Sequence, residues 1–160
     1  MTGRLQDRIV FVMGAGSRGQ GWSNGKAASV LFAREGALVF AVDISADAAA
    51  ETRDIIRGEG GNAESFVADA TDSASVKAAV EACVAAYGGI HVLHNNVGAA
   101  APGDPVEMPE DVWQRNMAIN VSSAFLTCKH ALPVIAEGGG GAVVNNASIA
   151  RIRNVERSLV

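Results

Sequence analysis

The chain has 160 residues, of which 49% are hydrophobic and 19% charged, and its formal net charge is −4. This balance is typical of one globular domain over residues 1–160 rather than of disorder, and the acidic charge argues against a nucleic-acid partner. No apolar run reaches the ~18 residues of a membrane span, and the N-terminus lacks the apolar core of a signal peptide. Two cysteines cannot form a disulfide framework. We therefore expect a cytoplasmic protein with no membrane contact.

Short apolar runs alternate along the chain with segments of helical periodicity. The apolar runs predict buried strands at residues 8–13, 37–42, 64–68, 90–93 and 142–145. The periodic segments predict helices at residues 23–35, 45–56, 72–87 and 109–136, the last of them interrupted near Asn120 and at Pro133. This alternation predicts an α/β fold, in which a parallel sheet is covered by helices on both faces and doubly wound by right-handed crossovers.

A glycine-rich loop follows the first predicted strand. Gly14, Gly16 and Gly19 match the pattern G-x-G-x-x-G, in which glycine allows a tight turn and lets backbone amides approach a pyrophosphate at a helix N-terminus. Asp43 ends the second strand and follows Gly25 at close to the ~20 residues expected for an acid that binds the adenosine ribose. This context predicts dinucleotide binding. The alternative is a mobile glycine loop, with Asp43 as a helix cap.

Asp43 also bears on the choice of cofactor. A carboxylate at this position would accept hydrogen bonds from both ribose hydroxyls and would repel a 2′-phosphate, which favours NAD over NADP. Arg18, in the glycine loop, would weaken this preference if its guanidinium paired with a phosphate; the alternative for Arg18 is a solvated loop cation.

Polar residues follow three further predicted strands. Asp69 comes after the third strand, Asn96 after the fourth and Ser148 after the fifth. Each of them alone is equally typical of a turn or a helix cap. Together they mark the carboxyl edge of the sheet, where doubly wound folds bind their ligands, whereas a random scatter of turn residues would mark both edges.

On these residues the chain resembles the N-terminal part of a short-chain dehydrogenase/reductase. The family's loop T-G-x-x-x-G-x-G is matched with Met13 in place of Thr, with residues 18–22 inserted, and with Ser23-Asn24-Gly25 in place of G-x-G. Asn95-Asn96-Val97-Gly98 resembles the family's N-N-A-G motif. The resemblance implies a three-layer, Rossmann-like sheet with strand order 3-2-1-4-5 that ends before the last strands. It implies cofactor contacts from Gly14, Gly16, Ser17, Ser23, Asn24, Gly25, Asp43, Ile44, Asp69, Ala70, Asn96, Val97 and Gly98.

The resemblance also supplies two catalytic positions. Ser148 looks like the serine that hydrogen-bonds the reacting oxygen, and Asn120 looks like the asparagine that kinks a long helix and holds a relay water. The family's Tyr-x-x-x-Lys pair would fall after Val160. The only tyrosine, Tyr87, lies on the apolar stripe of a helix, where we expect a core residue. We therefore expect an incomplete active site and little turnover from these 160 residues alone.

The implied activity is hydride transfer between a nicotinamide cofactor and a small secondary alcohol or ketone. The alternative is a non-catalytic dinucleotide-binding module or an inactive truncated relative. A nucleotide-binding transferase is less favoured, because apolar residues rather than an acid precede the glycine loop. Family members are usually homodimers or homotetramers, so we expect an oligomer. We expect no metal site, because His91, His94 and His130 lack partners at ligand spacing.

Overall fold

The computed structural model describes residues 3–101, 103–104 and 106–148. Its strands are β1 (Ile9–Met13), β2 (Leu38–Asp43), β3 (Asn62–Val67), β4 (Val92–Asn95) and β5 (Ala142–Asn145). Its helices are α1 (Asn24–Arg34), α2 (Ala46–Gly58), α3 (Ser73–Tyr87), α4 (Glu110–Met117), the π-helical segment η1 (Ala118–Ser122) and α5 (Ser123–Glu137). The five strands form one parallel sheet in the order β3-β2-β1-β4-β5, which confirms the expected fold and strand order.

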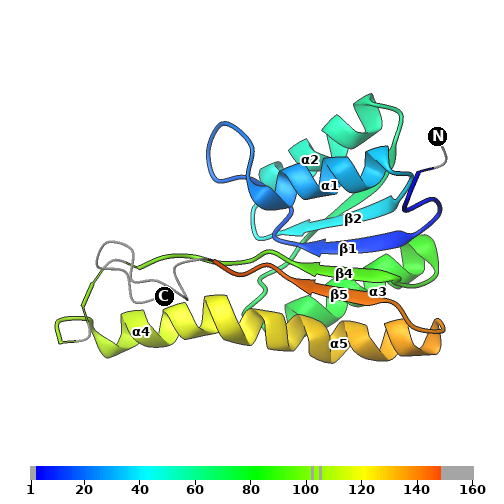
Figure 1. Ribbon diagram of the computed structural model, residues 1–160. Coiled ribbons are helices and arrows are strands. Elements are labelled where there is room, and N and C mark those ends of the chain that lie inside the picture. The colour runs from blue at the N-terminus through cyan, green and yellow to red at the C-terminus, as the bar shows by residue number, and fades with distance from the viewer. Residues whose placement is uncertain (1–2, 102, 105, 149–160) are drawn as a thin grey trace.

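Helices cover both faces of the sheet, with α1 and α2 on one side and α3, α4 and α5 on the other (Figure 1). The central strand β1 is buried along its whole length, as a continuous apolar run requires. Its alternate residues serve two separate cores: Val10 and Val12 face the α1–α2 layer, while Phe11 and Met13 face the α3–α5 layer. Burial on both faces therefore fixes β1, and with it the start of the glycine loop.

The starts of two strands, β3 and β4, each differ by two residues from the prediction. β3 begins at Asn62, two residues before the predicted start, because Asn62 and Ala63 pair with Leu38 and Val39 of β2. β4 is shifted toward its carboxyl end and includes Asn95, which pairs with Met13. Strand boundaries at polar residues cannot be located from the sequence pattern, because an apolar run marks only the buried middle of a strand.

The long helix is interrupted at only one of the two predicted places. The π-helical segment η1 contains Asn120, as expected, but α5 runs unbroken through Pro133. Proline removes the hydrogen bond to the carbonyl of residue i−4, which here is Lys129. Pro133 and Lys129 both lie on the exposed side of α5, so water can satisfy the released carbonyl and the helix continues.

We expect His94 on β4 to make the stability of the fold depend on pH. Its ring packs edge-on against Phe32, its Nδ1 has no hydrogen-bond partner among the described residues, and burial lowers the pKa of His94. The unfolded chain would bind a proton near the ordinary pKa of ~6.5 while the folded chain resists it, so stability is fully present above that pH and falls below it. We expect the free energy of unfolding in urea to drop between pH 7.5 and pH 5.5, and to drop less in His94→Leu. Equal drops in both proteins would contradict this account.

Candidate functional site

The loop after β1 is folded against the end of β2. The backbone N–H groups of Gly14 and Ala15 donate to the carbonyl oxygen of Val42 at 2.8 and 2.9 Å. Gly14 has φ +86°, and a Cβ there would come within 3.0 Å of Val97, so both conformation and space favour glycine. The turn therefore brings the loop close to the ends of β2 and β4.

Asp43 is the last residue of β2, and its half-buried carboxylate organises this turn. Oδ2 accepts a hydrogen bond from the Gly16 N–H at 2.9 Å, and Oδ1 accepts one from the Ser45 N–H at 3.1 Å. Each carboxylate oxygen can accept a second hydrogen bond. Asp43 thus fixes the loop and keeps acceptor capacity for a further donor.

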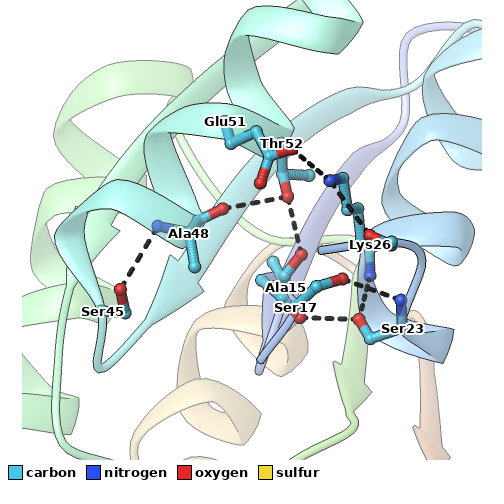
Figure 2. Close-up of polar contacts among 10 residues, drawn as sticks. Ala15, Ser17, Ser23, Lys26, Ser45, Ala48, Glu51 and Thr52 are labelled. Carbon is cyan, nitrogen blue, oxygen red and sulfur yellow. Dashed lines mark hydrogen bonds and ion pairs between the residues drawn. The ribbon is translucent and has the colours of Figure 1, made fainter. Parts of the chain in front are cut away.

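Helix α1 begins under the loop with a side-chain cap. Ser23 Oγ accepts from the Lys26 N–H at 3.1 Å and donates to the Gly16 carbonyl at 2.6 Å, while the Ser23 N–H donates to Ser17 Oγ at 2.8 Å. Figure 2 shows this arrangement, with Ser17 beside Ser23 at the start of the helix. The N–H groups of Asn24 and Gly25, the first two helical residues, have no acceptor within the helix, as is general at helix N-termini.

A cavity of about 680 Å³ opens at the carboxyl ends of β1, β2, β3 and β4. Ten of the residues predicted as cofactor contacts line it: Gly14, Gly16, Ser17, Ser23, Asp43, Ile44, Asp69, Ala70, Asn96 and Val97. The inserted residues 18–22 also line it, as do Arg115 of α4 and Ile119 of η1. The sheet topology thus brings residues from four strand ends to one cavity.

Three predicted contacts do not line this cavity: Asn24, Gly25 and Gly98. Gly25 instead lies against the loop, where a Cβ would overlap the carbonyl oxygen of Gly14. Gly98 lies beside Asn120, whose Oδ1 would be 3.2 Å from a Cβ at Gly98. Asn24 is exposed at the first turn of α1. Gly25 therefore permits the close approach of α1 to the end of β1.

Asparagine side chains tie the strand ends together. Asn96 Nδ2 donates to the Gly14 carbonyl at 3.1 Å, and Asn146 Nδ2 donates to Asn96 Oδ1 at 2.7 Å. One residue earlier, Asn95 Nδ2 donates to Asn145 Oδ1 at 2.8 Å. These bonds join the ends of β1, β4 and β5, and Asn96 also lines the cavity.

Asp69 forms a compact turn after β3. Its Oδ1 accepts from the N–H and the hydroxyl of Thr71 at 2.8 and 2.7 Å, and its own N–H donates to Ser75 Oγ at 3.0 Å. This is the turn geometry that the sequence left open as an alternative. Asp69 both forms this turn and lines the cavity, together with Ala70 and Thr71.

The two predicted catalytic residues lie outside the lining of this cavity. Asn120 Oδ1 accepts from the Ala99 N–H at 3.1 Å, and its Nδ2 donates to the carbonyls of Ala99 and Asn116 at 2.9 and 3.0 Å. Asn120 thereby holds the segment after β4 against the π-helical turn. Ser148 is exposed and follows β5 by three residues, at the same sheet edge as the glycine loop.

Tyr87 lies at the other end of the sheet. Its hydroxyl donates to Oδ1 of Asn62, the first residue of β3, at 3.0 Å, and burial raises the pKa of Tyr87 to about 12. Its ring packs edge-on against Phe40 in the core, as the sequence predicted. Within the described ranges, His, Cys, Asp and Glu side chains form no cluster of three or more suited to a metal ion, and none of the helices could cross a membrane.

Thr52, Lys26 and Arg115 take part in the site without any sequence signal that marks them. Thr52 Oγ1, fully buried, lies 2.9 Å from the Ala15 carbonyl and 3.1 Å from the Ala48 carbonyl, and it donates toward both. Lys26 is almost fully buried beneath the inserted loop. Arg115 of α4 lines the cavity, which the helical pattern of α4 does not reveal.

Comparisons with known proteins agree with this geometry. A family model described as short chain dehydrogenase matches residues 8–158. Relatives include an uncharacterized oxidoreductase of Bacillus subtilis, 36% identical over 98% of this chain and 56% of the relative, and a cyclohexanol dehydrogenase of Acinetobacter sp., 31% identical over 98% and 61%. A D-threitol dehydrogenase of Mycolicibacterium smegmatis is 36% identical over 92% and 55%.

Solved structures show the same relationship. A Burkholderia xenovorans structure assigned to the short-chain dehydrogenase/reductases has a TM-score of 0.91 and 46% identity, covering 94% of this chain and 60% of that one. A 7α-hydroxysteroid dehydrogenase complexed with NADH has a TM-score of 0.89 and 29% identity, covering 96% and 58%. The chain spans between 55% and 61% of the length of the three curated relatives above. On the family match and the shared fold, the chain belongs to the short-chain dehydrogenase family.

Proposed function

We propose that the protein containing this chain is an NAD-dependent oxidoreductase that transfers hydride between the nicotinamide and a small secondary alcohol or ketone. The observation that carries this proposal is the cavity at four strand ends, where the glycine loop and Asp43 meet. The names of two relatives, a cyclohexanol and a D-threitol dehydrogenase, support an alcohol substrate. On the same observations, we propose that residues 1–160 form one dinucleotide-binding domain.

The residues around the cavity fit a dinucleotide. A Cβ at Gly16 would lie 2.9 Å from Asp43 Oδ2 and 2.5 Å from Ala48 Cβ, so glycine lets the loop pack closely against the end of β2 and the first turns of α2, as in dinucleotide-binding loops. The positive end of the α1 dipole, at Ser23 in the lining of the cavity, favours a pyrophosphate. Asp43 would accept hydrogen bonds from the ribose hydroxyls, with Ile44, 67% exposed, as an apolar surface for the adenine side.

The chemistry divides between the cofactor and the chain. A bound nicotinamide supplies the hydride acceptor or donor, and the protein supplies orientation and proton transfer. Ser148 would hydrogen-bond the reacting oxygen of the substrate. Asn120, held by Ala99 and Asn116, would keep the π-helical turn in place and position a relay water. We propose that the general acid/base comes from a Tyr-x-x-x-Lys segment outside residues 1–160.

The first experiment is an assay of the intact protein with NAD and a panel of secondary alcohols, reading the absorbance of the reduced nicotinamide. Turnover with at least one alcohol supports the oxidoreductase. Dinucleotide binding without turnover on any member of the panel, in either direction, would favour a non-catalytic dinucleotide-binding module instead. An intact mass of the protein purified from its source accompanies the assay and shows how far the chain extends.

Asp43 provides the test of cofactor preference. Replacing it by asparagine removes the charge that repels a 2′-phosphate and one of its acceptors, so the preference for NADH over NADPH should fall by about tenfold, as expected for hydrogen bonds to a charged group. The dissociation constants of both nucleotides measure this ratio. Asp47→Asn, on an exposed first turn of α2 and outside the cavity lining, is the matched control and should keep the wild-type ratio. An unchanged ratio in Asp43→Asn would rule out the assigned role.

We also propose a homodimer or homotetramer in the cytoplasm. The support for an oligomer is the apolar surface of α4 and α5, on which Trp113, Phe125 and Leu132 are 44%, 63% and 46% exposed. Exposed apolar side chains of this size on one helical layer are typical of protein interfaces. Sedimentation of the intact protein measures the state of assembly.

A further inference from the structure

Lys26, the third residue of α1, carries an ammonium group that is buried beneath the inserted loop. The residue is only 3% exposed. Its Nζ forms an ion pair with Glu51 Oε1 at 2.6 Å, donates to the Gly21 carbonyl at 3.3 Å and lies 5.4 Å from the centre of the Trp22 ring. Figure 2 shows the side chain extending from α1 toward Glu51 on α2.

These three partners belong to two different parts of the protein. Glu51 lies on α2, whereas Gly21 and Trp22 belong to the inserted loop. Burying an ammonium costs several kcal/mol unless it is paired and hydrogen-bonded, and a cation over an indole face gains further attraction. The geometry that satisfies Lys26 therefore fixes the end of the loop relative to both helices.

The inserted loop has little other support. Among the described residues, the bond from Lys26 Nζ to Gly21 is the one hydrogen bond that residues 18–22 make. A Cβ built at Gly19 or Gly21 would meet no atom within 4 Å, so the loop is not packed against the body of the domain. The same five residues nevertheless line the cavity. Lys26 thus supplies the one described hydrogen bond to a segment that lines the cavity.

We propose that Lys26 is a positioning residue, which holds residues 18–22 where they form one side of the dinucleotide cavity, with Glu51 as its fixed partner. The inference rests on the proposed function, since it takes a dinucleotide as the ligand of this cavity. Its consequence is quantitative: the apparent dissociation constant equals the intrinsic one divided by the fraction of molecules whose loop is in place. Loss of the ammonium lowers that fraction.

The principal variant is Lys26→Met in the intact protein, because methionine keeps the length and the apolar stem but removes the charge. If the loop is in place about a tenth of the time without its partner, the dissociation constant of NADH rises about tenfold. Lys26→Arg keeps a cation that can pair with Glu51 and should restore most of the affinity. Glu51→Gln, at a side chain that is 54% exposed, tests the contact from α2 and should weaken binding in the same direction.

A matched control separates this effect from the loss of any lysine. Lys77 pairs with Glu81 on α3 at 3.6 Å, with both side chains more than 60% exposed, and lies outside the cavity lining. Lys77→Met should leave the dissociation constant of NADH at the wild-type value. Thermal unfolding of every variant reports whether the fold is kept.

Trp22 gives a readout that does not depend on the ligand. Residues 1–160 contain two tryptophans, so a background with Trp113→Phe, and with any tryptophan outside these residues also replaced by Phe, leaves Trp22 as the only one. Without ligand, its fluorescence anisotropy should fall in Lys26→Met and recover in Lys26→Arg. An unchanged anisotropy, or a fall in anisotropy with unchanged NADH affinity, would overturn the inference. Failure of the wild-type protein to bind NADH would overturn the proposed function instead.

Discussion

Replacing Ser148 by alanine should lower the kcat of the intact protein by about two to three orders of magnitude while leaving its affinity for NADH unchanged. A hydrogen-bond donor aimed at a reacting oxygen acts mainly in the transition state, and removing one such donor typically costs this much. The affinity for NADH should be unchanged because Ser148, which follows β5, is not among the residues that line the cavity. Steady-state kinetics and a separate NADH titration measure the two quantities.

Two further variants make the result specific. Ser148→Thr retains a hydroxyl and should recover part of the lost kcat. Ser65→Ala, on β3 at the opposite edge of the sheet, removes a serine hydroxyl that contacts Arg53 and should keep the wild-type kcat. Full activity in Ser148→Ala would mean that the resemblance fails at this position, and weaker NADH binding in the same variant would point to a structural role.

The architecture was predictable because it depends on local sequence patterns. Apolar runs such as residues 8–13 have no polar face, so they predict strands covered on both sides, and the helical segments between them predict a parallel sheet. Gly14 and Asp43 were also predictable as neighbours, since each ends a strand of such a sheet and the carboxyl ends meet at one edge. The structure places Gly16 N–H against Asp43 Oδ2, a contact that follows from that arrangement.

The roles within the loop were less predictable. Ser17 and Ser23 were expected as cofactor contacts, and their hydroxyls also hold the backbone of the loop and cap α1. A serine before a helix can do either, and only the path of the inserted residues decides which backbone groups come within reach. That path is set by contacts between distant parts of the sequence.

Lys26 is the clearest case of such a distant contact. Lysine is almost never buried unless it is paired, and nothing in the sequence marks Lys26 as a buried residue. The partner, Glu51, lies 25 residues away on the next helix, and no local pattern joins the two. At Pro133 a local rule gave the wrong prediction. Proline in a helix predicts a break, but Pro133 lies on the exposed face of α5, where water can satisfy the released carbonyl, and the helix continues.

Replacing Gly25 by alanine should have the largest effect on the fold of the site. In an open helix this change would stabilise the protein by up to ~1 kcal/mol, because alanine has the higher helix propensity. At Gly25, however, a Cβ would overlap the Gly14 carbonyl oxygen and lie 2.6 Å from Asn96 Nδ2, which itself donates to that carbonyl. Helix α1 must then move away from the end of β1, and overpacking of this kind costs about 1–3 kcal/mol or more.

The displacement should also reach ligand binding, because Gly14, Asn96 and Ser23, the N-cap of α1, line the part of the cavity proposed for the pyrophosphate. We therefore expect Gly25→Ala to lower the free energy of unfolding by about 3 kcal/mol and to weaken NADH binding by at least about tenfold. Gly58→Ala is the matched control, since a Cβ at this end of α2 meets no atom within 4 Å and should be neutral or stabilising. If Gly25→Ala were as stable as Gly58→Ala and bound NADH as the wild type does, the close approach of α1 to the loop would not be what shapes the cavity, and the assignment of the helix end to the pyrophosphate would fail with it.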